Sequence, residues 1–171
     1  MILRQAKKTD AEEIAAIHVA SWRDAYRPFL DANYLAGPVE QDRLNVWVER
    51  FAREDTNWNV TIAEAQNELL GFVCTFGDCD PHWGALLDNL HVLPRLKRSG
   101  IGTQLIRAAA SWVVREHPTK GMHLWVFEGN ESARAFYSRM GGTAVERAIN
   151  STHGGASPSL RYYWPAPANM K

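Results

Sequence analysis

Lys97 and Arg98 are followed closely by Gly100 and Gly102. An apolar run ending at Pro94 precedes this group, and an amphipathic helical pattern follows it. Glycine lets a ligand come close to the backbone, and the first N–H groups of a helix have no partner within it, so they attract anions. The arrangement predicts a loop that binds a phosphate chain.

Two common phosphate-binding patterns do not fit this spacing. A P-loop requires a lysine directly after its second glycine, and Thr103 stands there instead. A dinucleotide-binding fingerprint requires a third glycine three positions after the second, where this chain has Leu105. What remains is the pattern Lys-x-x-Gly-x-Gly between a strand and a helix.

A second group of residues follows a short apolar run further along the chain. Asn130 is suited to cap a helix, and Gly141 is suited to end it. Helical spacing places Asn130, Ala133 or Arg134, and Tyr137 on one face. An amide and a phenol can therefore reach the same ligand.

Together the two motifs resemble the GCN5-related N-acetyltransferase (GNAT) superfamily, which combines a Gln/Arg-x-x-Gly-x-Gly/Ala loop with a later Asn-x-x-Ala-x-x-Phe-Tyr helix. Lys97 departs from the usual first residue but keeps a positive charge. The resemblance extends over nearly the whole chain and implies acetyl-coenzyme A as cosubstrate, without a metal ion. The coenzyme contacts that it implies are Leu90, His91, Val92, Lys97, Arg98, Ser99, Gly100, Ile101, Gly102, Thr103, Asn130, Ala133, Phe136 and Tyr137.

The resemblance also implies how the coenzyme is held. The strand at 85–93 is expected to be bulged and to diverge from its neighbour, so that the pantetheine arm pairs with main-chain groups in the gap. The amides of residues 98–103 are expected to bind the pyrophosphate. Arg95, Lys97 or Arg98 would meet the adenosine 3′-phosphate, unless this basic cluster is a solvated turn.

The expected fold is α/β (α+β): a mixed, mostly antiparallel sheet of about seven strands, splayed at the coenzyme and flanked by about four helices. The linker 151–158 has loop composition. The second helix should bury Leu44, Trp47, Val48 and Phe51. Periodicity and end signals predict strands at 2–5, 58–64, 69–76, 85–93, 124–127, 143–150 and 159–164, and helices from about 9 to 28, 39 to 53, 101 onward and 131 to 140.

Composition agrees with one compact domain, which the resemblance implies is a GNAT domain over 1–166, with a short tail over 167–171 and fraying from Pro165. The 171 residues include 19 basic and 19 acidic side chains, so the balanced charge does not favour a nucleic-acid partner. Cys74 and Cys79 fit neither a metal site nor a disulfide scaffold and are interpreted as reduced thiols. No apolar stretch suggests a membrane span or a secretion signal, so a cytoplasmic protein is expected.

Acetyl transfer to an amine requires a neutral nitrogen and a protonated leaving thiol. An alkyl ammonium with a pKa of ~10 is neutral at pH 7 in only about one molecule per thousand. Tyr137 is the candidate acid, since the tyrosine at the matching family position lies near the thioester sulfur. The alternative is a packing tyrosine beside Phe136.

The base is ambiguous from the sequence. Some family members carry a glutamate five positions before the asparagine, where this chain has Trp125. Asp88 and His91 are the candidates. Other family members carry an acidic group near the position of Asp88, and the ordinary pKa of a histidine such as His91 is close to neutral. Asp88 could instead be a solvent-facing residue, and His91 could be a histidine that only packs in the sheet. A chain of water molecules, without a dedicated base, would serve the reaction equally well.

The acceptor is expected between the first two helices and the late loop. Trp22 and Tyr26 share a helix face that either walls a pocket or packs in the core, and Asp24 could attract an ammonium group. Trp83 and the 151–158 loop are candidates for the rim. Nothing in these residues identifies the amine of the small molecule or peptide.

Two other classes of protein stay in view. One is a non-catalytic acyl-coenzyme A sensor, and the other is a different nucleotide-binding protein, which would have to explain the missing third glycine. The chain is expected to be a monomer or a homodimer. Tyr162, Tyr163 and Trp164 would either complete the core or form the dimer contact.

Overall fold

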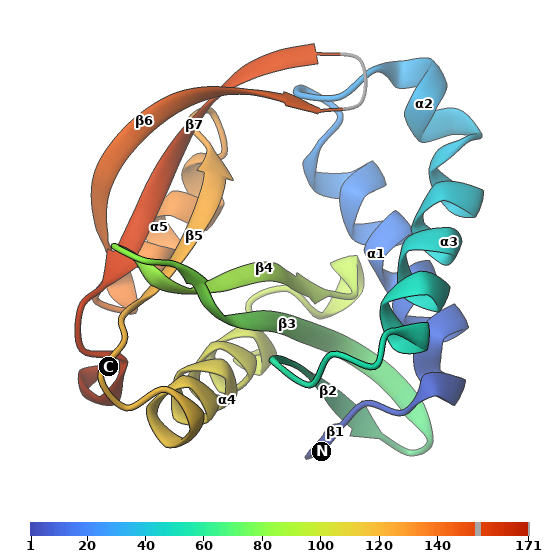
Figure 1. Cartoon of the computed structure of the whole chain (residues 1–171). Coiled ribbons are helices and arrows are strands. Elements are labelled where there is room, and N and C mark those ends of the chain that lie inside the picture. Colours follow the sequence, from blue (N-terminus) through green and yellow to red (C-terminus); the bar gives the residue numbers. More distant parts are fainter. Residues whose placement is uncertain (153–154, 171) are drawn as a thin grey trace.

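A seven-stranded sheet organises the part of the chain that the computed structural model describes, residues 1–152 and 155–170 (Figure 1). Its order is β1-β2-β3-β4-β5-β7-β6, and every neighbouring pair is antiparallel except β4 and β5. The strands are β1 (Ile2–Gln5), β2 (Trp58–Ala65), β3 (Glu68–Asp80), β4 (Gly84–Val92), β5 (Met122–Phe127), β6 (Thr143–Thr152) and β7 (Gly155–Trp164). The mixed, mostly antiparallel sheet expected from the sequence is confirmed.

Helices cover the two faces of this sheet. Helices α1 and α3 lie together on one face, with the short α2 between them in the chain, and α4 packs on the other face against β2, β3 and β4 (Figure 1). The short α2 was not predicted, although Asp31 caps it by accepting from the Tyr34 N–H at 2.9 Å. The helices are α1 (Ala11–Ala25), α2 (Ala32–Ala36), α3 (Val39–Ala52), α4 (Ile101–Glu116) and α5 (Glu131–Arg139).

Strand β3 is buried on both faces and separates two apolar clusters. Val73 belongs to the cluster beneath α4, whereas Phe72 and Cys74 belong to the cluster formed with α1 and α3. Alternating side chains of a strand point to opposite faces, so a strand covered on both sides reads as a nearly continuous apolar run. Both cysteines are free, as expected.

Strand β4 is irregular at the point where the sheet opens. Cys74 pairs with Asn89 and Thr75 pairs with Leu87, so Asp88 is the extra residue of a β-bulge. The parallel pairing of β4 with β5 is confined to Ala85–Met122 and Leu86–His123. Beyond these pairs the two strands diverge, and the splay expected at this position is confirmed.

The structure corrects the expectations for the C-terminal segments. Most of the predicted 151–158 loop is strand, because β6 and β7 continue the hairpin ladder to Thr152 and from Gly155; residues 153–154 lie outside the described ones. The segment after Pro165 is not frayed, since Pro167 is buried and Met170 packs against the main core. Lys171 also lies outside the described residues.

Burial also decides whether four residues lie in the core, as the sequence left open for three aromatic residues and predicted for one aliphatic residue. Tyr162 and Trp164 are 4% and 3% exposed, so they complete the core, while Tyr163 is half-buried. Val48, predicted on the inner face of α3, is 48% exposed and was assigned wrongly. In the described part of the chain, no helix is long and apolar enough to cross a membrane.

Candidate active site

A cavity of about 310 Å³ opens where β4 and β5 diverge. The splay removes the ladder hydrogen bonds between these strands, so main-chain groups and side chains of both strands face the opening. Helices α1, α3 and α5 and strand β7 complete the wall. The lining residues are Trp22, Tyr26, Leu30, Arg43, Arg50, Leu87, Asp88, Asn89, Leu90, His91, Leu124, Trp125, Val126, Phe127, Tyr137 and Ser159.

The glycine loop follows β4 and leads into α4. A 3-10 turn at Pro94–Leu96 is followed by Arg98 with φ +66° and Gly100 with φ +87°. A Cβ on Gly100 would have no neighbour within 4 Å, so glycine serves the left-handed conformation rather than a lack of space. The loop thereby turns the free N–H groups at the start of α4 outward.

The electrostatics at the start of α4 favour an anion. The helix begins at Ile101, and no acidic residue stands in its first turn. Its N-terminal amides and the positive end of its dipole are therefore not neutralised from within the helix. This is the loop predicted for a phosphate chain.

Helix α5 adds the other predicted motif. The Asn130 side chain accepts from the Ala133 N–H at 3.2 Å, which caps the helix as expected, and Gly141 ends it with φ +85°. The Phe136 ring lies against Gly102, 3.7 Å from the position of a Cβ there. Tyr137 lines the cavity, and its ring packs against Phe136, Tyr162 and Trp164.

Burial raises the pKa of Tyr137, with a smaller contribution from Tyr26. Burial, aided by the charge of Asp88, likewise raises the pKa of Tyr26 to about 12. Both phenols are therefore protonated throughout the neutral range. Each can act as a proton or hydrogen-bond donor toward the cavity.

His91 lines the cavity and is fixed from behind. Its Nδ1 lies 2.9 Å from the Ser21 Oγ, and its ring stacks on His18 with centroids 4.5 Å apart. His18 Nδ1 in turn accepts from the Trp47 Nε1–H at 3.1 Å, so the proton of neutral His18 is on Nε2. Burial, reinforced by the charges of Arg43 and Lys97, lowers the pKa of His91 to about 3.

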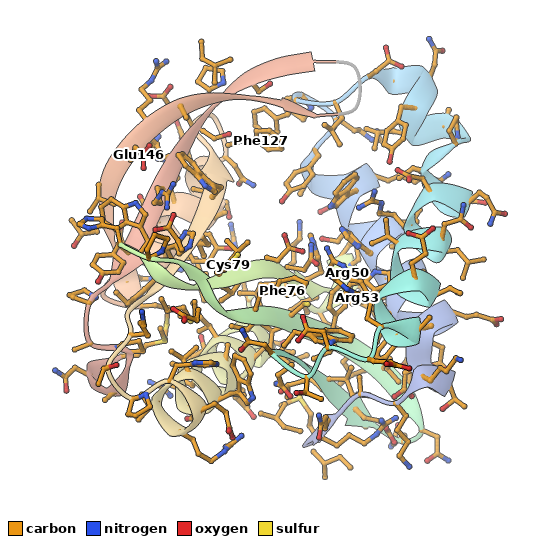
Figure 2. The ribbon with its side chains drawn as sticks, viewed as in Figure 1. Arg50, Arg53, Phe76, Cys79, Phe127 and Glu146 are labelled. Atoms are coloured by element: carbon orange, nitrogen blue, oxygen red, sulfur yellow. The ribbon has the colours of Figure 1, made fainter. Side chains whose placement is uncertain are left out.

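Asp88 is held by an arginine from α3. Its carboxylate accepts from Arg50 at 2.6 Å, and the same guanidinium donates to the Asn89 Oδ1 at 2.7 Å. The guanidinium carbon also lies 4.9 Å from the centre of the Trp47 ring and 5.3 Å from that of Phe76. Figure 2 shows Arg50 and Phe76 between α3 and the central strands. The β-bulge thus presents a carboxylate that is already paired.

Two predicted acceptor residues are not part of this wall. Asp24 forms an ion pair with Lys97, so a residue expected at the acceptor contacts one expected at the coenzyme. Trp83 packs against Tyr163, with ring centroids 5.0 Å apart, and the Arg161 guanidinium lies over it at 5.2 Å. Of the four predicted acceptor residues, the structure brings Trp22 and Tyr26 to the cavity.

Sequence reasoning missed both arginines of the wall. Arg43 is 8% exposed, lies 4.5 Å from the centre of the Trp22 ring and pairs with Asp42 at 2.9 Å. On α3, positions 43, 47 and 50 share one face at helical spacing. That spacing could have indicated that the arginines face the cavity. An arginine within an apolar helical pattern is, however, normally expected to extend its charged group into solvent. Trp125 and Phe127 were missed because β5 was interpreted only as buried.

Two features of this site are those that the resemblance to the GNAT acetyltransferases predicted. They are the divergence of β4 from β5 and the glycine loop that follows β4. The chain belongs to this class: the sequence pattern of the acetyltransferase (GNAT) family matches residues 4–142. The match includes the loop and the capped helix that ends near Gly141.

Individual relatives agree with this assignment. A probable N-acetyltransferase of Mycobacterium tuberculosis is 32% identical over 141 residues, covering 80% of this chain and 76% of that protein. An uncharacterized N-acetyltransferase of Archaeoglobus fulgidus is 30% identical over 146 residues, covering 81% and 90%. Among solved structures, the paiA N-acetyltransferase of Thermoplasma acidophilum in complex with coenzyme A has a TM-score of 0.74 and 17% identity, covering 95% of this chain and 98% of that one. The last likeness shows the fold.

Proposed function

We propose that this chain transfers an acetyl group from acetyl-coenzyme A to a primary amine of a small molecule or peptide, by direct attack within a ternary complex. The observation that carries the proposal is that three features occur together around strand β4. A cavity lies in the split between β4 and β5, a phenol reaches it from α5, and an anion-binding helix start follows β4 directly.

The residues present fit a coenzyme A molecule. Leu90, His91 and Val92 pair with β3 but have no partner on β5, and such an open edge pairs with an extended ligand. The amides of residues 98–103 would hold the pyrophosphate, with Lys97 or Arg98 near the 3′-phosphate. We assign Asn130, Ala133, Phe136 and Tyr137 to the other side of the same ligand.

The proposed reaction needs one proton donor and one proton acceptor. The amine lone pair forms the N–C bond to the acetyl carbon, and the C–S bond breaks. Tyr137 gives its phenolic proton to the departing thiolate, and the phenol recovers a proton as the new amide nitrogen releases one through water. The N–H groups exposed on β4 would stabilise the oxyanion formed between these steps.

The two candidate bases have surroundings that suit other roles. An imidazole whose pKa is lowered to about 3 does not hold a proton taken from an amine, so we assign His91 to the shape of the cavity. Asp88 is paired with Arg50, so we assign it to the structure of the wall rather than to removal of the amine proton. We therefore assign removal of the amine proton to water, and we propose Trp22 and Tyr26 as walls of the acceptor pocket.

Thermal unfolding with acetyl-coenzyme A tests the proposal, with NAD and ATP as controls. A ligand at a hundred times its dissociation constant adds about 2.7 kcal/mol, which moves the midpoint by a few degrees. A shift with acetyl-coenzyme A alone supports the proposal, and an amine panel with thiol detection then follows. A larger shift with NAD or ATP would show a nucleotide-binding protein, and binding without turnover across the panel would show a sensor.

A further inference from the structure

The cavity wall carries more positive than negative charge. Among the described residues that line it, Arg43 and Arg50 of α3 are cationic, and Asp88 of β4 is acidic. Tyr26 just after α1, Tyr137 of α5 and His91 of β4 are uncharged at neutral pH, because burial favours their neutral forms. The side chains that β5 and β7 contribute have no titratable group.

The acidic residue of this wall is already engaged. Asp88 is bound by Arg50 at 2.6 Å, and Asn89 fixes the same guanidinium at 2.7 Å. Arg43 forms an ion pair with Asp42, which does not line the cavity. Among the described lining residues, the one carboxylate is therefore already paired, and no unpaired anion compensates an entering ammonium group for its lost hydration, so the charged form of an amine is disfavoured.

The wall also offers no strong proton acceptor. His91 is buried, its Nδ1 is occupied by Ser21, and its ring stacks on His18, near the charges of Arg43 and Lys97. Protonating it would add a further positive charge to the same wall. An amine that arrives as an ammonium therefore has to lose its proton to water before it reacts.

We propose that the acceptor is a weakly basic primary amine, of the kind found at a peptide N-terminus, an amino-acid amide or an arylamine, rather than a strongly basic alkylamine or a polycation. This inference rests on the proposed acetyltransferase function. An α-amine with a pKa of about 8 is neutral at pH 7 in roughly one molecule in ten, against one in a few thousand for a lysine-type amine. Such an acceptor enters uncharged and needs no base in the wall.

A matched pair of small acceptors tests the class in the wild-type enzyme. Glycinamide carries a weakly basic α-amine and propylamine a strongly basic one, at nearly the same size. Thiol release at pH 7 should give glycinamide a kcat/KM at least about tenfold higher, and the gap should narrow as the pH rises toward 10 and propylamine loses its proton. Triglycine, aniline and spermidine then separate peptides, arylamines and polycations.

Each outcome has a distinct meaning. Propylamine or spermidine equal to glycinamide at pH 7 overturns the acceptor class alone. Stabilisation by acetyl-coenzyme A without thiol release from any weakly basic amine also overturns it. The absence of both stabilisation and thiol release overturns the proposed function, and the acceptor class with it.

A charge variant tests the origin of the selectivity. Arg50→Gln leaves the Asp88 carboxylate unpaired in the wall, so the preference for glycinamide over propylamine should fall at least about fivefold. Arg53→Gln is the matched control, because Arg53 is exposed at the end of α3 and does not line the cavity (Figure 2). The acetyl-coenzyme A shift in unfolding midpoint shows that each variant is folded. An unchanged preference in folded Arg50→Gln would refute the electrostatic origin.

Discussion

The glycine-loop side of the cavity and its α3 side are built in opposite ways. The loop side is a continuous segment, residues 90–103, and it offers mainly backbone groups set by a strand end, a left-handed glycine and a helix start. The α3 side is a set of side chains from three elements that are distant in the sequence: Arg43 and Arg50 of α3, Trp22 of α1, and Asp88 and His91 of β4.

The difference is reflected in the electrostatics of the two sides. The loop side keeps unpaired donors at its surface, which is suited to an anionic ligand. The α3 side satisfies its charges internally, through Arg50 with Asp88 and Arg43 with Asp42. Ligand contacts made by backbone groups change little when a residue is substituted. Contacts made by side chains can be removed or replaced by single substitutions. We expect binding of the coenzyme and choice of the acceptor to be separable by mutation.

Acid should affect the α3 side most strongly. Burial lowers the pKa of His91 to about 3 and lowers the pKa of His18 well below its usual value. The unfolded chain titrates near pH 6.5, so it binds more protons below that pH, and the stability present above pH 6.5 is lost as the pH falls toward 3. Between pH 7 and 5 His91 alone costs ~2 kcal/mol, and His18 adds to the loss in the same direction. Urea unfolding at pH 7, 6 and 5 measures the loss.

His18→Gln refines this test. Glutamine keeps an acceptor for the Trp47 Nε1–H but does not titrate. The slope of the unfolding free energy against pH should therefore correspond to about one proton fewer taken up on unfolding. A wild-type unfolding free energy that is the same at pH 7 and pH 5 would show that these rings are not kept neutral by burial.

A negative charge on the loop side should strongly weaken coenzyme binding without harming the fold. In Gly102→Asp the new side chain has room, since a Cβ there has its nearest neighbour at 3.7 Å, and an acidic residue in the first turn of a helix is favourable. Acetyl-coenzyme A should bind about a hundredfold more weakly, since the carboxylate repels the phosphates and takes their donors. Titration calorimetry measures the affinity.

Ser111→Asp is the control for this change, because it adds the same charge to an exposed position further along α4. Equal weakening in both variants would mean that net charge, rather than the helix start, governs binding.

Removing the Tyr137 hydroxyl should reduce turnover and leave binding nearly unchanged. In Tyr137→Phe the ring contacts with Phe136 and Trp164 remain, so the packing is kept. Loss of a general acid predicts a kcat at least about tenfold lower, with the acetyl-coenzyme A affinity within about twofold of wild type. Tyr163→Phe, outside the cavity wall, should keep wild-type turnover. A normal kcat in Tyr137→Phe would remove this residue from the mechanism.

The ion pair of Asp24 with Lys97, which links α1 to the glycine loop, is expected to have the smallest effect on binding and stability. Both side chains are nearly half exposed, so breaking the pair should change stability by less than about 1 kcal/mol. Lys97→Gln should weaken acetyl-coenzyme A binding a few-fold, more so at low salt. Asp24→Asn frees the lysine and should leave that binding equal or slightly tighter. An acceptor KM raised by Asp24→Asn would instead return this residue to the acceptor site.

The sequence alone was sufficient for the features that depend on local interactions. Pro94, Gly100 and Gly102 predict the turn and helix start because backbone conformation there is limited by residue type. Asn130 and Gly141 predict a helix between them for the same reason. Alternation and periodicity predicted the order of the main strands and helices. The resemblance, which rested on these motifs, then predicted the splayed sheet.

Only the tertiary structure decided which side chains meet. Nothing local shows that Arg50 binds Asp88 across 38 positions, or that Asp24 forms an ion pair with Lys97 of the glycine loop. The extension of β6 and β7 through a loop-like sequence depends on pairing across the hairpin, which outweighs weak intrinsic propensity. Charge pairing and burial are properties of neighbours in space, so the charge pairs of the cavity wall are decided by the packing of α3 over β4 and not by either segment alone.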